Sequence, residues 1–396
     1  MGRTFAIIGG GIAGACVADH LARATETEDK IVLFEQGDPA AETTRKSVAQ
    51  FGYYGDSLQH AMKQYGMAYY NDVLNETGEP IPYQYAGLLS IARNDSDGAR
   101  LAALADREDG GAGKIVGSGW DRDFVRYLAP EEIYQELFVP PLNTNEITGA
   151  VYRPRMGYFT DPQALSLSVL QRAKAAGVET RRNTRVEEIR TKQGRVTEVV
   201  ADERLPVDAV VCAAGPWNPA VAAKIGLDIP VNHTLAPVLQ LEPPEPIPYS
   251  MPAITLFNDP HAIHRRRANR CLIGYNPPEG YRRDERFDPD EVPDIVPTRI
   301  RDGMWDAARS VTPYIADGTL IDEWVGVRSQ TPDGNPIVGW TAVEGFSILA
   351  FNTSGIQLAP AAASVISREL VENDPTEWYD GLSITRFNGY RDAVST

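Results

Sequence analysis

Three glycines near the start of the chain have the spacing of a dinucleotide-binding turn. They are Gly9, Gly11 and Gly14, in the pattern G-x-G-x-x-G, and they directly follow an apolar, strand-like run. In such a turn the first glycine allows the tight bend and the second allows backbone to approach a pyrophosphate. The third lets the following helix pack closely on the strand. A helical pattern and a second apolar run follow, and that run ends at Glu35, placed to accept hydrogen bonds from a ribose diol.

The helix that begins after the turn supplies the rest of this candidate site. Backbone N–H groups at Ile12 and Ala13 would lie in its first turn, where unpaired donors and a partial positive charge favour phosphate. We therefore predict a dinucleotide site formed by the strand, turn, helix, strand and acid. A glycine-rich turn that binds no ligand is the alternative.

Composition restricts the class of protein around this site. The chain has 396 residues, of which 43% are hydrophobic and 9% aromatic, enough for a large core in two interleaved domains. Its net charge of −16 argues against nucleic acid and anionic membrane surfaces as partners. No apolar run reaches the ~18 residues of a membrane span, and the first strand leaves no room for a secretory signal. We expect a cytoplasmic protein without a membrane span.

The remaining sequence patterns predict two kinds of sheet. An apolar run at 207–212 followed by small residues is typical of a parallel strand whose carboxyl end faces a ligand. Longer strands with turn signals between 235 and 275 indicate an antiparallel sheet. Asp161 is expected to cap a helix that begins at Pro162. Other expected elements are a helix at 58–74, a strand at 83–92, a helix at 101–107, a turn at 109–113, a hairpin of 186–189 with 196–201, and a helix at 358–370.

Together these pieces resemble the D-amino-acid oxidase-like family of FAD-dependent amine oxidoreductases, which includes glycine oxidase, sarcosine oxidase and the D-amino-acid dehydrogenases. Beyond the glycine turn, the resemblance rests on residues 46–50, 210–217, 324–336 and 345–360. D-arginine-type dehydrogenases look especially similar around 324–328 and 355–357. The resemblance implies an α/β fold, in which a Rossmann-like FAD-binding domain is interleaved with an antiparallel-sheet substrate domain of α+β type. The FAD-binding domain would comprise 1–80, 150–230 and 320–396, and the substrate domain 81–149 and 231–319.

The resemblance favours FAD over NAD, because its C-terminal motif places a second helix N-terminus at the flavin, where negative charge develops on reduction. Sarcosine oxidase relatives attach flavin covalently through a cysteine near the segment of Arg328. The three cysteines here, Cys16, Cys212 and Cys271, lie elsewhere and are too widely spaced for a disulfide framework or a metal site. We therefore expect non-covalent FAD and no metal. The residues implied at the cofactor are Gly9, Gly11, Ile12, Ala13, Gly14, Glu35, Lys46, Ser47, Gln50, Val186, Ala214, Gly215, Trp217, Arg328, Ser354, Gly355, Ile356 and Gln357.

The implied reaction is hydride transfer from the α carbon of an amino acid to flavin N5, which gives an imine that hydrolyses to a 2-oxo acid. Arg328 matches the position at which relatives hold the substrate carboxylate, a task suited to a guanidinium; a structural arginine is the alternative. His264 falls where the similar dehydrogenases have an active-site tyrosine, and period-two alternation puts Arg266 on the same face. A solvated basic edge is the alternative for these two. Tyr53 could line the pocket or belong to the core.

Departures from the family pattern leave the identity of the substrate undecided. The strand at 235–241 offers only apolar residues and Gln240 where relatives often supply a second polar group. This leaves room for an N-methylated amino acid or a 2-hydroxy acid, and a non-catalytic FAD subunit is a further alternative. A basic substrate would need an acid such as Glu323 or Asp259. The family's usual Gly-His is Phe351-Asn352 here. The electron acceptor is oxygen, a quinone or a protein carrier.

Overall fold

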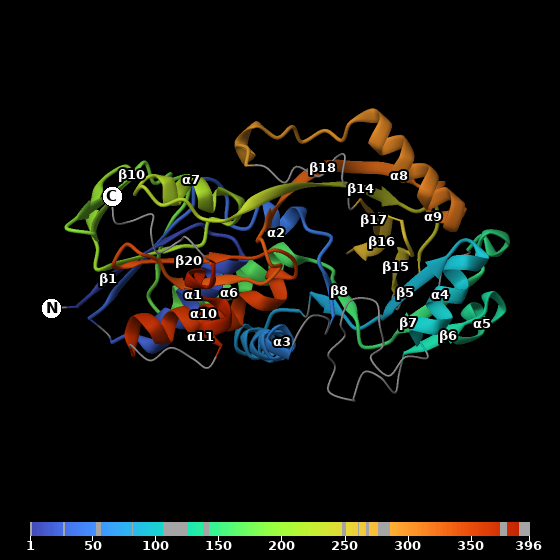
Figure 1. Cartoon of the computed structure of the whole chain (residues 1–396), viewed down its shortest axis with the longest axis horizontal. Helices are drawn as coiled ribbons and strands as arrows, with labels where there is room; N and C mark the ends of the chain where they lie inside the picture. The colour runs from blue at the N-terminus through green and yellow to red at the C-terminus, as the bar shows by residue number, and fades with distance from the viewer. Residues whose placement is uncertain are drawn as a thin grey trace.

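A computed structural model of the chain describes residues 2–26, 28–52, 57–80, 82–105, 125–137, 142–247, 251–259, 261–266, 269–275, 286–372 and 378–387. The larger sheets are a six-stranded and an eight-stranded one (Figure 1). The long strands β14 (Asn232–Glu242) and β18 (Thr319–Gln330) run along one side of the molecule, from the region of the first sheet into the second.

The six-stranded sheet is mostly parallel and combines strands from distant parts of the chain. Its order is β19-β20-β13-β1-β2-β9, and only β19 and β20 pair in antiparallel fashion. The carboxyl ends of β1, β2 and β13 therefore meet at one edge, which is where such sheets bind nucleotides. The strands are β1 (Thr4–Ile8), β2 (Lys30–Phe34), β9 (Glu179–Arg181), β13 (Ala209–Cys212), β19 (Ile337–Trp340) and β20 (Phe346–Ala350).

Both faces of this sheet are buried, which explains the nearly continuous apolar runs of its strands. Phe5 and Ile7 pack with helices α1 (Ile12–Ala24), α6 (Pro162–Ala175) and α10 (Gly355–Val371). Ala6 and Ile8 face the other way, toward residues of α7 (Asn218–Ala223) and of a small antiparallel sheet. That sheet contains β10 (Glu188–Lys192), β11 (Arg195–Val200) and β12 (Arg204–Pro206).

The eight-stranded sheet carries the second core on one of its faces. Its order is β18-β14-β17-β16-β15-β5-β7-β6, antiparallel except for the pair of β15 and β5. Leu239, Val327 and Ile273 point toward helix α8 (Thr298–Val311) and α9 (Pro313–Ala316), with which they form an apolar cluster. The further strands are β5 (Leu88–Ala92), β6 (Arg126–Leu128), β7 (Gly149–Arg153), β15 (Ala253–Leu256), β16 (His261–Arg266) and β17 (Arg270–Tyr275).

A second small sheet, of three strands, connects the two larger ones. In it β8 (Gly157–Phe159) pairs with β3 (Gln50–Phe51) and β4 (Tyr83–Gln84). The remaining helices are α2 (Thr43–Lys46), α3 (Ser57–Thr77), α4 (Asp95–Ala105), α5 (Pro130–Glu136) and α11 (Tyr379–Leu382). The short 3-10 turns are η2 (Thr144–Glu146), η3 (Gly215–Trp217), η4 (Pro289–Glu291) and η5 (Ile384–Arg386).

The expected fold class is confirmed, with differences in particular elements. The predicted strand at 83–92 is two strands, because Gly87 between them adopts φ +86°. Helix α4 begins at Asp95, earlier than the predicted start at residue 101, and the predicted turn at 109–113 lies outside the described residues. The division into FAD-binding and substrate domains stays a proposal; β18 lies in the eight-stranded sheet although its residues from 320 onward had been grouped with the FAD-binding domain.

Candidate functional site

The glycine turn lies between β1 and α1, and each glycine meets a different steric demand. Gly9 has φ +108°, which L side chains rarely adopt. A Cβ on Gly14 would overlap the carbonyl oxygen of Gly9, so this position fixes how closely helix and strand approach. A Cβ on Gly11 would meet only the Thr44 hydroxyl, at 3.3 Å, because this residue borders a cavity. Each of the three glycines therefore has the steric role expected of it in a pyrophosphate-binding turn.

Glu35 is held in a fixed orientation at the end of β2. Its Oε2 accepts a hydrogen bond from the amide of Gly10 at 2.7 Å, and its Oε1 accepts one from the amide of Gly37 at 2.8 Å. The carboxylate lines the same cavity as Gly11. It keeps lone pairs for a ribose diol while its backbone contacts prevent it from rotating away.

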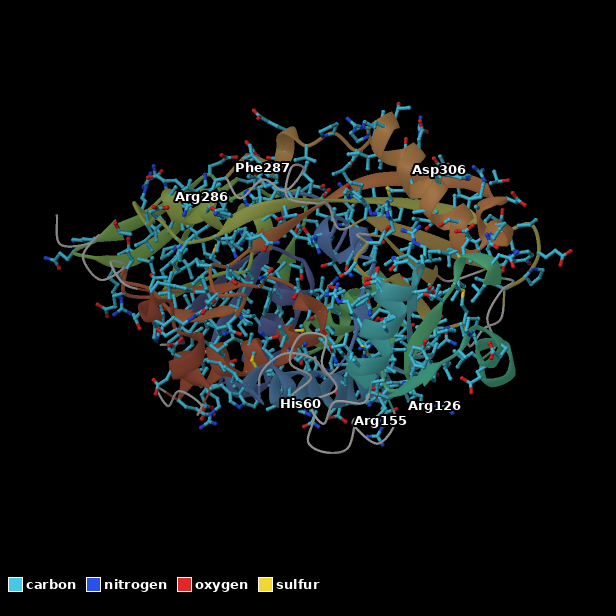
Figure 2. The ribbon with its side chains drawn as sticks, turned by 45° about the vertical axis from the view of Figure 1, so that its right-hand side comes forward. His60, Arg126, Arg155, Arg286, Phe287 and Asp306 are labelled. Atoms are coloured by element: carbon cyan, nitrogen blue, oxygen red, sulfur yellow. The ribbon has the colours of Figure 1, made fainter. Side chains whose placement is uncertain are left out.

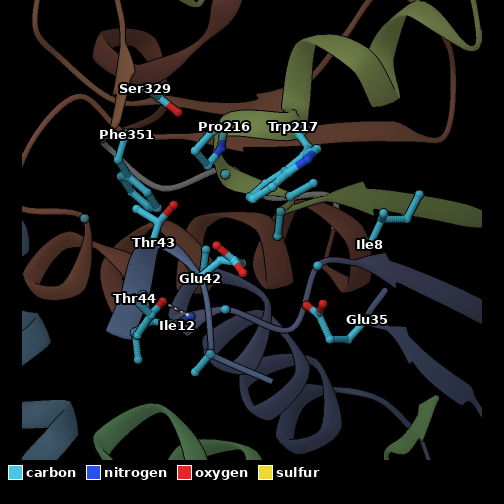
Figure 3. Close-up of a pocket in the computed structure, with 18 of the residues that line it drawn as sticks. Ile8, Ile12, Glu35, Glu42, Thr43, Thr44, Pro216, Trp217, Ser329 and Phe351 are labelled. Carbon is cyan, nitrogen blue, oxygen red and sulfur yellow. Dashed lines mark hydrogen bonds between the residues drawn. The ribbon is translucent and has the colours of Figure 1, made fainter. Parts of the chain in front are cut away.

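One elongated cavity runs from Glu35 to the start of α10, and Figure 3 shows it between Pro216 and Trp217 on one side and Glu35, Ile12 and Thr44 on the other. Most of the residues expected at the cofactor line it: Gly9, Gly11, Ile12, Ala13, Glu35, Ser47, Val186, Ala214, Gly215, Trp217, Arg328, Ser354, Gly355 and Ile356. Gly14, Lys46, Gln50 and Gln357 are not part of the lining.

Several lining residues were not anticipated from the sequence. Thr44 belongs to no recognisable sequence motif. Its hydroxyl nevertheless accepts a hydrogen bond from the amide of Ile12 at 3.2 Å, the dashed line in Figure 3. Arg185 and Lys224 bring cationic groups to the lining. These side chains come from a short helix and two loops, and only the packing of the six-stranded sheet brings them to the glycine turn. The remaining unanticipated residues are Ile8, Phe34, Gln36, Asp38, Ala40, Ala41, Glu42, Thr43, Thr184, Ala213, Pro216, Ala220, Val221, Ser329 and Thr353, whereas Phe351 and Asn352 had been singled out from the sequence as a departure from the family pattern.

The start of α10 forms the opposite end of the cavity. Ser354 precedes the helix with φ +58°, and Gly355 and Ile356 line the cavity in its first turn. Gln357 is 1% exposed and accepts a hydrogen bond from the amide of Gly52 at 3.2 Å, while its Nε2 has no partner among the described residues. The N-terminus of α10, where Gly355 and Ile356 line the cavity, fits the carbonyl-rich edge of a flavin ring.

Lys46, which was expected at the cofactor, does not line the cavity but pairs with two carboxylates outside it. Its Nζ lies 2.9 Å from Glu42 and 2.8 Å from Asp294, and its carbonyl accepts a hydrogen bond from the Trp324 indole at 2.8 Å. Burial opposes the charge of Lys46, but the two carboxylates outweigh burial and raise its pKa. Lys46 thus fastens helix α2 to β18.

Arg328 lies on β18 directly opposite Thr234 of β14, and it lines the cavity, as Phe351 and Gly355 also do. Residues opposite one another in an antiparallel pair share a face. Thr234 is 1% exposed, and its hydroxyl has no partner among the described residues. The strand predicted from the sequence begins at residue 235 and so does not include Thr234. A threonine next to a run of apolar strand residues is the signal that could have identified it.

The other expected substrate residues are placed only in part. His264 pairs with Leu272 and Arg266 with Arg270 between β16 and β17, and the side chains of His264 and Arg266 lie outside what the structure describes. Tyr53 also lies outside the described residues.

The two candidate acids for a basic substrate are engaged elsewhere. Glu323 lies 3.2 Å from Arg301 of α8, and Asp259 contacts Arg93 and lies 2.5 Å from the His261 ring. Burial opposes the charge of Asp259, but its hydrogen bonds with His261 outweigh burial and lower its pKa. Neither acid lines the cavity.

A segment that we call the strap, residues 286–297, lies along the outside of the cavity. Asp290 accepts a hydrogen bond from the Trp217 indole at 2.9 Å and pairs with Arg185 at 3.2 Å, so it contacts two residues of the lining. Figure 2 labels Arg286 and Phe287 at the start of the strap. The buried ring of His233 joins the same parts: its Nδ1 accepts from the amide of Phe287, and its Nε2 donates to the carbonyl of Pro216 at 2.7 Å.

Other chemistries find no support in the part of the chain that the structure covers. Cys16, Cys212 and Cys271 are buried, and none of them lines the cavity. Over the described ranges, no cluster of His, Cys, Asp and Glu is arranged to hold a metal ion. No described helix combines the length and apolarity needed to cross a membrane.

Comparisons with known proteins agree with this geometry. Glycine oxidase from Bacillus licheniformis is 25% identical over 96% of this chain and 96% of its own length. The formaldehyde-forming 4-methylaminobutanoate oxidase from Paenarthrobacter nicotinovorans is 25% identical over 97% of this chain, which spans only 46% of that protein. The crystal structure of glycine oxidase from Bacillus cereus ATCC 14579 superposes with a TM-score of 0.78 at 20% identity, over 96% of this chain and 99% of that one.

The family model described as FAD dependent oxidoreductase (DAO) matches residues 4–369, from the first strand to the end of α10. The chain belongs to this DAO family, and it is an FAD-dependent oxidoreductase.

Proposed function

We propose that this protein oxidises an amino acid or an N-substituted amino acid at its α carbon, to an imine that hydrolyses to a 2-oxo acid and an amine. The names of its relatives support oxidation of an amine that carries a carboxylate: glycine oxidase, 4-methylaminobutanoate oxidase and, at 23% identity, human dimethylglycine dehydrogenase. Glycine oxidase supports the α carbon as the carbon oxidised, whereas the formaldehyde-forming 4-methylaminobutanoate oxidase points to an N-methyl carbon as the alternative. All three substrates are small amines that carry a carboxylate. A D-amino acid is the finer form of the proposal, and it rests on the resemblance of residues 324–328 and 355–357 to D-arginine-type dehydrogenases.

Arg328 is the observation that carries the proposal. Arg328 lines the same cavity as Gly355 and Ile356, in the first turn of the helix at whose N-terminus the flavin ring would lie. A guanidinium binds a carboxylate through two parallel, charge-assisted hydrogen bonds, which fixes both the position and the rotation of the substrate. The α carbon next to that carboxylate would thereby be held over the ring.

The chain's own residues would hold the cofactor without a covalent bond. Gly11, Ile12 and Glu35 are suited to the pyrophosphate and ribose, and the first turn of α10 to the ring. FAD, when bound, supplies the acceptor for the hydride that leaves the substrate. The dipole of α10, a helix of 17 residues, stabilises negative charge at its N-terminus without reorganisation. His264 and Tyr53 remain proposed substrate contacts.

The ion pairs made by Glu323 and Asp259 indicate which substrate side chains the protein could accept. Glu323 and Asp259 are paired with Arg301 and Arg93, respectively, so neither is available to a basic side chain. The described residues therefore favour a neutral or acidic substrate over an arginine-like one. The division of the chain into FAD-binding parts (1–80, 150–230, 320–396) and substrate-binding parts (81–149, 231–319) belongs to this proposal as well.

Anaerobic bleaching of the flavin absorbance tests the proposal directly. The panel contains D-amino acids, N-methyl amino acids and 2-hydroxy acids, and we expect bleaching by one of the two amine classes. Bleaching by 2-hydroxy acids alone would replace the proposal with 2-hydroxy-acid oxidation. No bleaching by any member, in protein that holds FAD, would favour a non-catalytic FAD subunit. Oxygen, a quinone and a protein carrier are then compared as acceptors with the identified donor.

The variant Arg328→Ala tests the carboxylate clamp. We expect kcat/KM to fall by about 2–4 kcal/mol equivalent, because truncation leaves the substrate carboxylate unpaired in a partly buried site. Arg301→Ala is the matched control, since Arg301 pairs with Glu323 of the same strand but does not line the cavity. Equal kinetics in the two variants would remove Arg328 from the substrate site.

A further inference from the structure

Pro360 interrupts the hydrogen bonds of α10 in the turn next to the cavity. In a helix each amide donates to the carbonyl four residues earlier, and the amide of Leu358 donates in this way to Ser354 at 3.0 Å. Pro360 has no N–H, so the carbonyl of Ile356 loses its regular donor, and a proline ring also crowds the carbonyl four residues before it. Ile356 lines the cavity. The carbonyl without its regular donor therefore belongs to the turn that would meet the flavin ring.

A tyrosine of α3 supplies the missing donor. The hydroxyl of Tyr70 donates a hydrogen bond to the carbonyl of Ile356, and the side chain of Tyr70 is fully buried. Burial raises the pKa of Tyr70 well above its usual value, so the hydroxyl keeps its proton and remains a donor. A hydroxyl from another helix thus replaces the N–H that Pro360 lacks.

Close packing of the two helices brings Tyr70 to this carbonyl. Gly66 lies one helical turn before Tyr70, on the same face of α3. A Cβ on Gly66 would lie 2.0 Å from the carbonyl oxygen of Gln357 and 3.6 Å from Cδ of Pro360. The helices can therefore approach this closely only because residue 66 has no side chain, and Figure 1 shows α3 next to α10. The face of α3 that carries Gly66 and Tyr70 is thus fitted to the first turns of α10.

The hydrogen bond from Tyr70 also acts on the amide at the other end of the same peptide unit. The carbonyl of Ile356 and the N–H of Gln357 belong to one planar, trans peptide, so they point in opposite directions. A bond that fixes the carbonyl therefore fixes the N–H, which points toward the N-terminus of α10. Donation to a carbonyl also polarises its peptide unit and strengthens the N–H as a donor. The hydroxyl thereby adds to the positive potential at this end of the helix.

We propose that Tyr70 is a positioning residue for the flavin: through the carbonyl of Ile356 it holds the first turn of α10 in the orientation that stabilises reduced FAD. Tyr70 is not among the residues that line the cavity, so it acts through the helix and not by contact. Negative charge develops on the flavin on reduction, and a helix N-terminus stabilises it. Loss of the hydroxyl should therefore weaken the binding of reduced FAD more than that of oxidised FAD. The proposal concerns the cofactor and is independent of which substrate is oxidised.

The reduction potential of the bound flavin, titrated against redox dyes, measures this difference without any substrate. Tyr70→Phe should make the potential more negative, and the ratio of the affinities for reduced and oxidised FAD should fall by at least about threefold, as expected when the field of a buried helix N-terminus is weakened. Tyr69→Phe is the matched control, because it removes the same atom from the adjacent residue, whose hydroxyl donates to Asp19. A potential in Tyr70→Phe equal to that in Tyr69→Phe, or more positive, would overturn the proposal.

Restoring the missing N–H tests whether Tyr70 replaces it. In Pro360→Ala the new amide can donate to the carbonyl of Ile356, so Tyr70→Phe added to this variant should shift the potential much less than it does in the wild-type protein. The ratio of flavin to protein and the unfolding temperature are followed in the same variants. If Tyr70→Phe alone does not retain FAD, the double variant should retain it. A double variant that shows the full shift, or that retains no FAD, would overturn the proposal.

Discussion

Replacement of Asp19 by asparagine should destabilise the protein strongly, although Asp19 lies far from any reacting atom. Asp19 is fully buried on α1. Its carboxylate accepts hydrogen bonds from Arg172 Nε at 2.9 Å and Nη2 at 2.6 Å, and from the Tyr69 hydroxyl at 2.7 Å. Asparagine keeps the shape but removes the charge, so Arg172 would retain only Glu76, 3.1 Å from its Nη1.

The magnitude follows from the difference in burial between the two acids. Breaking a buried ion pair on one side costs about 3–5 kcal/mol, because the other charge stays buried without its partner. The side chain of Glu76 is 47% exposed, and a pair of that kind contributes about 0–1 kcal/mol. Asp19→Asn should therefore lower the free energy of unfolding by about 3–5 kcal/mol, and Glu76→Gln by less than about 1 kcal/mol.

Urea unfolding followed by far-ultraviolet circular dichroism measures both variants against wild type. A third protein, Asp19→Leu combined with Arg172→Met, removes both charges and should recover most of the loss, since apolar replacement of a buried pair is often neutral. Equal unfolding midpoints for Asp19→Asn and Glu76→Gln would refute the reasoning. A double variant as unstable as Asp19→Asn would show that packing, not the unpaired charge, sets the loss.

Three further outcomes are expected. Gly14→Ala should purify with little FAD, because its Cβ displaces the glycine turn, whereas Gly303→Ala, with open space around that position, should retain a normal ratio of flavin to protein. Burial lowers the pKa of His20 to about 4, so stability should fall by up to about 3 kcal/mol as pH drops from about 6.5 toward 4, and His20→Gln should flatten that slope. Asp290→Ala should speed FAD release, measured by flavin fluorescence, because it removes the acceptor that holds the Trp217 indole; unchanged release would separate the strap from cofactor retention.

Local signals in the sequence predicted local structure well. The spacing of Gly9 to Gly14 predicted the turn, and the expected cap at Asp161 is confirmed, since its side chain accepts from the amide of Ala164 at 2.9 Å. The family, its FAD cofactor and the fold class are also confirmed. These features depend on residues close together in the chain or on motifs with a fixed order.

Sequence patterns could not predict which residues from distant parts of the chain lie together in the folded protein. Thr44, Arg185 and Lys224 line the cavity because distant strands pair correctly, and no local pattern distinguishes them from surface residues. The roles assigned to Arg328, His264 and Tyr53 stay predictions until the variants and the substrate panel are measured.

Neighbouring strands of the six-stranded sheet come from distant parts of the chain, and this has a consequence for folding during synthesis. Its central strands span the chain from Thr4 to Ala350, and the cavity takes residues from Ile8 to Ile356. A nascent chain on the ribosome therefore cannot complete the cofactor pocket until nearly all of it has emerged. β1 pairs with the nearby β2, but β13 lacks its partner β20 until residue 346 and those after it have been made, and such long-range pairing is slow and leaves apolar edges exposed. FAD can therefore stabilise the fold only once residues up to Ile356 have been made, late in synthesis.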